Sequence, residues 1–248
     1  MFDGRFLFFV VVGFVAQLVD GALGMAYGVI SNSLLLTAGL PPAVASASVH
    51  AAEVVTTGVS GVTHHAFGNV DRGLLKRLAI PGVAGAAIGA YALVSVPGDA
   101  VKPYIALYLL SMGVLILWKT LRGQPAERRD VRHVSILGLA GGFCDAVGGG
   151  GWGPVVTSTL VARGHNPRMT IGSVNLAEFF VTVAASVVFI LTIGLSNWST
   201  VLALIAGGVL AAPLAAYTTR LIPARALMGL VGALIILTSL RTLALAWF

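Results

Sequence analysis

The chain has 248 residues, of which 57% are hydrophobic and 10% are charged, and its formal net charge is +6. Soluble domains carry roughly 25% charged residues, so this composition excludes an ordinary soluble protein and indicates a membrane protein. The single cysteine, Cys144, excludes an intrachain disulfide framework.

Ten apolar segments follow one another along the chain in two sets of five. The first set lies at 5–19, 25–38, 43–67, 76–96 and 101–121, and the second at 133–145, 152–163, 168–194, 199–221 and 225–246. Crossing hydrocarbon needs about 20 helical residues, a length that the last three segments of each set reach. The first two of each set are shorter, at about 12–15 residues, so each pair either crosses as tilted helices or forms a re-entrant hairpin. The number of full crossings, six or ten, stays open.

The second set of segments repeats the first at an offset of 125 residues, as between Asp20 and Asp145. The same offset aligns Gly24 with Gly149, Gly28 with Gly153, Ser48 with Ser173, and Glu53 with Glu178. This period is far longer than that of solenoid repeats. The sequence therefore predicts a duplicated bundle, with a first membrane repeat at 1–122, a linker at 123–131 and a second membrane repeat at 132–248.

Basic residues gather on one side of the predicted membrane. All of the 15 Lys and Arg residues except Arg5, Lys102 and Arg241 fall in or beside the loops on that side. The positive-inside rule predicts that these loops and the linker are cytoplasmic and that both termini are outside. Each repeat then crosses an odd number of times, and the two repeats are inverted. Inverted repeats with broken helices are typical of secondary transporters, whose substrate site lies near the bilayer midplane.

Four acidic residues lie at membrane depth, and they form the two aligned pairs Asp20 with Asp145 and Glu53 with Glu178. An ionisable side chain at the helix centre costs about 2.5–3.5 kcal/mol on insertion scales and marks a functional site by default. No lysine or arginine lies deep in any segment, so no ion-pair partner is evident. We expect Asp20 and Asp145 to accept N–H groups at a helix start, as N-caps do, with proton or cation coupling as the alternative.

Two glycine-rich turns follow these aspartates, "DGALGMAYG" at 20–28 and "DAVGGGGWG" at 145–153. Glycine lets the backbone turn, and a helix that begins at such a turn presents free N–H groups that favour an anion. The turns therefore supply predicted substrate-binding residues: Gly24, Gly28, Gly149, Gly150, Gly151, Trp152 and Gly153. The alternative is that the glycines only allow close helix packing, as expected for Gly85, Gly89, Gly207 and Gly208.

The third segment of each repeat adds polar side chains, Ser48 and His50 in the first and Ser173 and Asn175 in the second. Each can donate a hydrogen bond to an oxyanion. His50 with Glu53, and Asn175 with Glu178, share a helix face because they are three residues apart. Glu53 and Glu178 are candidate proton carriers, and a polar clamp between the repeats is the alternative. The sequence shows no metal-ligand spacing, so no metal site and no cofactor are expected.

The duplicated pattern resembles the sulfite exporter TauE/SafE family, also called the toluene-sulfonate uptake permeases. The resemblance rests on the two glycine turns, on "GLPPAVASAS" and "GHNPRMTIGS", and on Glu53 and Glu178, and it covers nearly the whole chain. It implies a bacterial or archaeal inner-membrane transporter of sulfur-containing anions such as sulfite, sulfonates or sulfoacetate. The first turn has Met25, Ala26 and Tyr27 where the second has Gly150, Gly151 and Trp152, so the second turn should contribute more glycine N–H groups.

The sequence thus predicts an all-α polytopic membrane protein of two inverted repeats that transports its substrate by alternating access. No GxxxxGK[ST] loop is present to bind nucleotide phosphates, so we expect no ATP hydrolysis and no enzyme activity. The expected partners are a small anionic substrate and membrane lipid, not nucleic acid, and homo-oligomerisation stays open. Two alternatives remain: a proton- or cation-coupled transporter of another small organic anion, and an intramembrane hydrolase with Asp20 and Asp145 as its dyad.

Overall fold

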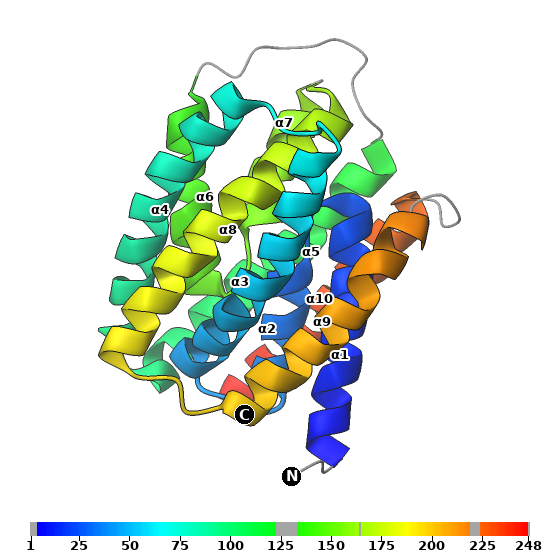
Figure 1. The fold of residues 1–248 in the computed structure, drawn as a ribbon. Helices are drawn as coiled ribbons and strands as arrows, with labels where there is room; N and C mark the ends of the chain where they lie inside the picture. The colour runs from blue at the N-terminus through cyan, green and yellow to red at the C-terminus, as the bar shows by residue number, and fades with distance from the viewer. Residues whose placement is uncertain (1–3, 123–132, 164, 219–223, 248) are drawn as a thin grey trace.

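The computed structural model describes residues 4–122, 133–163, 165–218 and 224–247, and these form a helical bundle (Figure 1). The first half contains α1 (Gly4–Leu23), α2 (Tyr27–Thr37), α3 (Pro42–Ala66), α4 (Arg72–Val94) and α5 (Gly98–Arg122). The second half contains α6 (Val134–Gly148), a π-helical turn η1 (Gly153–Thr157), α7 (Ser158–Ala162), α8 (Pro167–Thr192), α9 (Trp198–Thr218) and α10 (Ala224–Trp247). The all-α prediction is confirmed, and the predicted linker at 123–131 lies outside the described residues.

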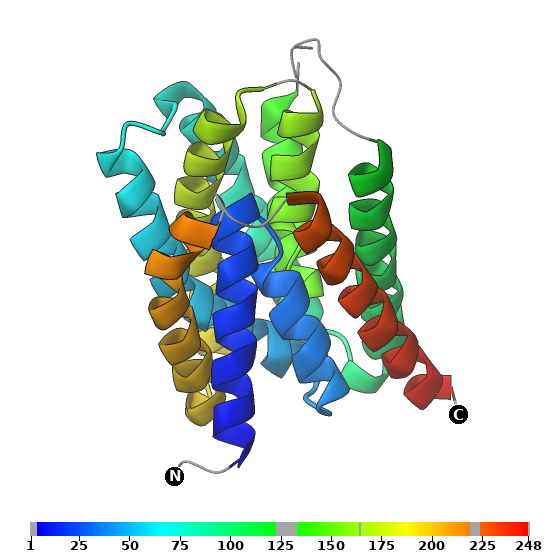
Figure 2. The same cartoon turned by 90° about the vertical axis from the view of Figure 1, so that its right-hand side faces the viewer.

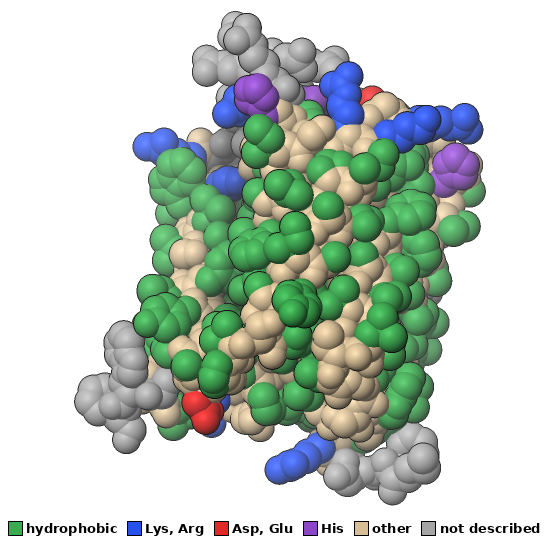
Figure 3. Space-filling view, turned by 90° about the vertical axis from the view of Figure 1, so that its left-hand side faces the viewer, with side chains coloured by type: hydrophobic (Ala, Val, Ile, Leu, Met, Phe, Trp, Pro, Cys, Tyr) green, Lys and Arg blue, Asp and Glu red, His purple; other side chains and the backbone are tan. Residues whose placement is uncertain are grey.

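Five of the described helices are long and apolar enough to cross a membrane, namely α1, α4, α5, α8 and α10. Their outward faces carry large apolar side chains such as Leu7, Ile80 and Leu191. One flank of the bundle is covered by hydrophobic side chains, whereas Lys, Arg and His side chains gather at its upper end (Figure 3). A continuous apolar surface of this kind suits lipid rather than water. The chain is therefore a polytopic membrane protein.

The helices that precede the two glycine turns run further than the sequence pattern indicates. α1 is 20 residues long and continues through Asp20 to Leu23, and α6 continues through Asp145 to Gly148. Asp20 and Asp145 therefore lie within helices, not in the turns between segments as expected. Glycine inside a helix costs only about 1 kcal/mol. The helices end where the backbone becomes left-handed, at Gly24 with φ +66° and Gly149 with φ +64°.

The two halves enter the bundle from opposite ends. α1 begins and α2 ends at the end of the bundle where α10 finishes, whereas α6 begins and α7 ends at the opposite end (Figures 1 and 2). α1 packs along α9 and α6 packs along α4, while α3 contacts α8 and α5 contacts α10. At the 125-residue offset α6 is the counterpart of α1, and α9 is the counterpart of α4. The contacts thus follow the pattern that two related halves would make.

Small residues let these helix pairs approach closely. A methyl group added to Gly13 would overlap the Leu204 carbonyl across α1 and α9, and one added to its counterpart Gly138 would lie 2.7 Å from the Leu78 carbonyl oxygen. Gly85 and Gly207 face the carbonyls of neighbouring helices in the same way. Close approach through small residues is how membrane helices gain packing contacts. The packing role predicted for Gly85 and Gly207 is therefore confirmed.

Candidate functional site

The two glycine turns lie against each other inside the bundle. A methyl group on Gly28 would lie 2.7 Å from the Gly150 Cα, and one on Gly153 would lie 2.5 Å from the Met25 Cα. Gly150 has φ +150°, a backbone conformation that side chains rarely adopt. The backbones of the two halves are thus in direct contact, and glycine is needed where they touch.

Each turn is also held by a side chain from the other half. Asn32 of α2 donates its amide hydrogen to the Gly148 carbonyl at 2.5 Å, and the Thr157 hydroxyl of η1 donates to the Gly24 carbonyl at 3.0 Å. Asn32 and Thr157 occupy corresponding positions at the 125-residue offset. The sequence analysis missed both residues. The signal that could have found them is a polar side chain at matching places in the two short apolar helices.

The aspartate before each turn accepts N–H groups at the start of the next helix. Asp145 Oδ1 accepts the backbone N–H groups of Gly151 at 2.8 Å and Trp152 at 3.0 Å. The backbone N–H of Tyr27, the counterpart of Trp152, donates to Asp20. These carboxylates occupy part of the N–H groups that the sequence analysis assigned to an anion. The first N–H groups of a helix have no partner within it, so an aspartate in this position satisfies them.

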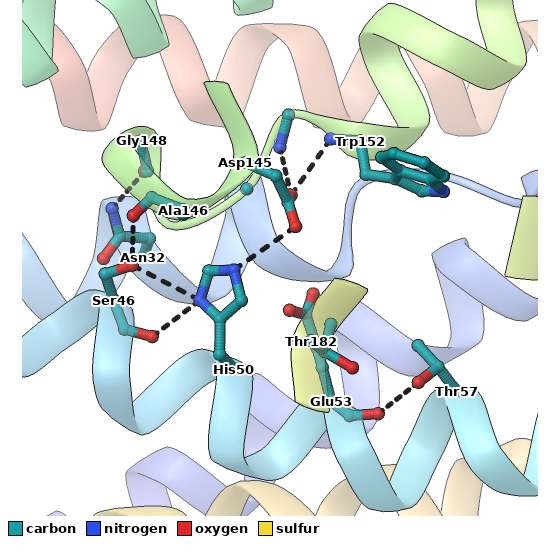
Figure 4. A network of polar contacts seen from close by, with 12 residues as sticks. Asn32, Ser46, His50, Glu53, Thr57, Asp145, Ala146, Gly148, Trp152 and Thr182 are labelled. Atoms are coloured by element: carbon teal, nitrogen blue, oxygen red, sulfur yellow. Dashed lines mark hydrogen bonds and ion pairs between the residues drawn. The ribbon is translucent and has the colours of Figure 1, made fainter. Parts of the chain in front are cut away.

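His50 connects α3 of the first half to α6 of the second (Figure 4). Its Nε2 lies 3.2 Å from Asp145 Oδ2, and its Nδ1 lies 2.8 Å from the Ser46 carbonyl oxygen and 3.3 Å from the Ser46 hydroxyl. The Ser46 hydroxyl in turn donates to the Ala146 carbonyl at 2.7 Å. Ser46 was not among the predicted site residues, although it lies four residues before His50 and so shares its helix face.

Glu53 completes a buried cluster with this pair. One ring nitrogen of His50 and one carboxylate oxygen each of Glu53 and Asp145 lie within 4.8 Å of one another. The three side chains are at most 1% exposed, and Glu53 Oε2 has no hydrogen-bond partner within the described part of the chain. One imidazole and two carboxylates at this spacing could hold a cation. The sequence placed His50 beside Glu53, but it gave no sign that Asp145 joins them.

At the 125-residue offset, the residues that correspond to His50, Glu53 and Asp145 are Asn175 and Glu178 of the second half and Asp20 of the first, and all three are buried. The amide nitrogen and oxygen of Asn175 and the Oε2 atom of Glu178 have no partner among the described residues. Burying an amide without hydrogen bonds costs roughly 1–3 kcal/mol in protein mutational data. Unpaired polar atoms inside the bundle are therefore candidates for contact with a bound ligand.

The remaining predicted donors are already used within the protein. The Ser48 hydroxyl donates to the Val44 carbonyl at 2.8 Å, and the Ser173 hydroxyl donates to the Met169 carbonyl at 2.7 Å. The Trp152 indole N–H donates to the Val174 carbonyl at 3.2 Å and fixes the start of η1 against α8. Of the four polar residues predicted on the third segments, Asn175 is the one whose side chain has no protein partner in the described ranges.

A helical bundle with an apolar flank, broken helices and buried ionisable groups defines a polytopic membrane protein with a polar centre. The chain belongs to the sulfite exporter TauE/SafE family, whose model matches residues 9–242. It is 48% identical to the probable membrane transporter protein YtnM of Bacillus subtilis (strain 168), over 98% of this chain and 84% of that protein. No solved structure matches the chain. The chain is thus a membrane transporter rather than an enzyme, which removes the hydrolase alternative.

Proposed function

We propose that this transporter moves a small sulfur-containing oxyanion, of the sulfite, sulfonate or sulfoacetate class, across the inner membrane by alternating access. The family supports a sulfite-exporter type of transporter, and the name of the Bacillus relative supports a membrane transporter. The observation that carries the proposal is the meeting of two helix starts, those of α2 and η1, at glycine contacts between the halves. Helix starts carry a partial positive charge, and their N–H groups beyond those that the aspartates accept suit an anion without a charged side chain.

The two halves are proposed to be inverted repeats at 1–122 and 132–248, joined by a cytoplasmic linker. In the first pair of contacting helices, α1 of the first half packs along α9 of the second; in the second pair, the counterparts α6 and α4 pack in the same way, which supports this arrangement. Orientation rests on the described basic residues, which lie mainly at the end of the bundle where α5 finishes and α6 begins (Figure 3). The positive-inside rule assigns that end to the cytoplasm and the two termini to the outside.

The proposed substrate site lies between the two turns, among Gly24, Gly28, Gly149–Gly153 and the polar side chains of α3 and α8. In this conformation the Gly150 backbone covers the first turn of α2. An anion therefore reaches the helix starts when the halves separate, which is the movement that alternating access requires. The Asn175 amide is the side-chain donor proposed to bind the anion, because its N–H groups have no acceptor among the described residues and binding would break no existing hydrogen bond.

A thermal-shift screen of the purified protein tests this proposal against sulfite, thiosulfate, sulfate, sulfonates and carboxylates. A ligand at 100 times its dissociation constant should add about 2.7 kcal/mol of stability. Replacing Asn175 with leucine, which keeps the branching at Cγ but removes both hydrogen-bonding groups, should abolish the ligand-induced shift. Ser186→Ala is the matched control, because Ser186 is also buried and unpaired on α8.

The result separates the alternatives. A shift with sulfur oxyanions that is retained in Ser186→Ala and lost in Asn175→Leu supports the proposed site. A shift of equal size in both variants would place the site elsewhere. A shift with carboxylates alone would instead favour the transporter of another small organic anion.

A further inference from the structure

We propose that His50, Glu53 and Asp145 form a proton-binding site that links the two halves of the bundle and couples substrate movement to protons. This inference rests on the proposed transport function and adds the coupling ion. It starts from the hydrogen-bond pattern around one imidazole ring.

The Nδ1 atom of His50 must carry a hydrogen. It lies 2.8 Å from the Ser46 carbonyl oxygen, which can only accept a hydrogen bond. The Ser46 hydroxyl, 3.3 Å from Nδ1, donates its own hydrogen to the Ala146 carbonyl, so it too acts as an acceptor toward the ring. A neutral histidine has one N–H, and with that hydrogen on Nδ1 the Nε2 atom presents a lone pair.

This lone pair faces Asp145 Oδ2 at 3.2 Å. An ionised carboxylate is acceptor-only, so the two atoms would present lone pairs to each other unless a proton lies between them. The Oδ1 atom of Asp145 already accepts two backbone N–H groups, which leaves Oδ2 as the oxygen that can share this proton. The contact therefore requires one bound proton, carried either by the ring as imidazolium or by Asp145 as a carboxylic acid.

The surroundings strengthen this requirement. The titratable groups around Glu53 are Tyr27 of α2, Asp20 of α1 and Glu178 of α8. Those around Asp145 are Tyr108 of α5 and Cys144 of α6. None of these groups supplies a positive charge. No described lysine or arginine forms an ion pair with these carboxylates, since His50–Asp145 is the ion pair found in the described ranges. Unpaired buried charges are costly, so a bound proton is the available compensation.

The proton sits on a junction between the halves. His50 belongs to α3 of the first half and Asp145 to α6 of the second. With the proton bound, the pair is held by a charge-assisted hydrogen bond. Without it, two acceptors repel at hydrogen-bond distance, and separation of the halves becomes more favourable. Glu53 belongs to the same 4.8 Å cluster and its Oε2 atom has no partner among the described residues, so Glu53 is the acceptor placed to receive the proton.

The second half has no histidine at the position that corresponds to His50. Asn175 stands where the first half has His50, and an amide has no group that gains or loses a proton near neutral pH. Proton binding is therefore asymmetric, although the framework of the two halves corresponds. This asymmetry suggests the variant His50→Asn as a test, because it makes the first half match the second at this position.

The test uses purified full-length protein in liposomes that contain a pH-sensitive dye. Two fluxes are measured: exchange of labelled substrate between equal concentrations on both sides, and proton movement driven by a substrate gradient. A sulfonate is used beside sulfite, because it carries no proton of its own near neutral pH. Substrate exchange reports the transport function alone, and the proton-to-substrate ratio reports the coupling.

We compare Asp145→Asn and His50→Asn with the control Asp99→Asn, which makes the same acid-to-amide change at an exposed residue in the first turn of α5. In Asp145→Asn the side-chain oxygen still accepts the two backbone N–H groups, and the new amide hydrogen can bond to Nε2 without any bound proton. We expect both site variants to lose substrate-driven proton movement, and Asp99→Asn to keep the wild-type proton-to-substrate ratio. Thermal unfolding of Asp145→Asn should depend less on pH than that of the wild type, which also shows that the variant is folded.

An unchanged proton-to-substrate ratio in both site variants would overturn the inference while leaving the transport function intact. Failure of the wild type to exchange any tested oxyanion would instead count against the proposed function. A stoichiometric metal ion in the purified protein that is lost in both site variants would also overturn it, because the cluster would then hold that ion in place of a proton.

Discussion

Adding a single methyl group at Gly28 tests whether the contact between the two turns holds the bundle in its closed form. Gly28 lies in the first turn of α2. An alanine Cβ at this position would lie 2.7 Å from the Gly150 Cα, 2.9 Å from the Gly149 carbonyl oxygen and 2.9 Å from Glu53 Oε1. Ordinary contacts between carbon atoms are about 3.5–4.0 Å, so the two turns must move apart.

The cost can be worked from this crowding. Overpacking a well-packed site costs about 1–3 kcal/mol. Replacing glycine by alanine inside a helix returns at most about 1 kcal/mol. Three atoms lie within 2.9 Å of the added Cβ, which puts the cost in the upper part of this range, at about 2–3 kcal/mol. The net loss of about 1–2 kcal/mol corresponds to about 2–8 °C in unfolding temperature for a chain of this size. If the added methyl group makes no close contact in an open form, the closed form also becomes about 5–30-fold less populated relative to that open form.

Gly28→Ala is compared with Gly229→Ala by thermal unfolding in detergent at one fixed scan rate, because unfolding of such proteins is often irreversible. Gly229 lies in α10 with no neighbouring atom within 4 Å of an added Cβ, so its variant should not be less stable than the wild type. A Gly28→Ala protein that unfolds at the wild-type temperature would refute the reasoning, since the turns would then have room between them.

Two further outcomes are expected. Glu53→Gln should slow transport and flatten its pH dependence more than Glu178→Gln does, because Glu53 is clustered with His50, whereas the counterpart of His50 beside Glu178 is Asn175. Identical pH profiles in the wild type and both variants would exclude the glutamates as proton carriers. An epitope tag inserted at residue 126 should be labelled only after the inner face of the membrane is exposed, whereas labelling in intact cells would contradict the inverted-repeat arrangement.

Much of the architecture could be predicted because its determinants are local. A run of about 20 apolar residues specifies a membrane helix whatever its neighbours are. The expected segment at 43–67 differs from α3, Pro42–Ala66, by one residue at each end. The end of α1 was placed too early, at residue 19 instead of Leu23. Charged and glycine residues weaken the apolar pattern, yet α1 continues through Asp20 and Gly21.

The sequence by itself determined that this chain is a membrane protein, that it is duplicated, and that acids and glycines lie at matching depths. These properties depend on composition, on periodicity and on the repetition of a pattern. Only the tertiary structure decided that His50 meets Asp145, 95 residues away, and that Asn32 and Thr157 each hold the turn of the other half. Such pairs depend on how α3 packs against α6 and how the turns meet. The sequence pattern specifies which face of a helix is polar, but not which residue of another helix that face will contact.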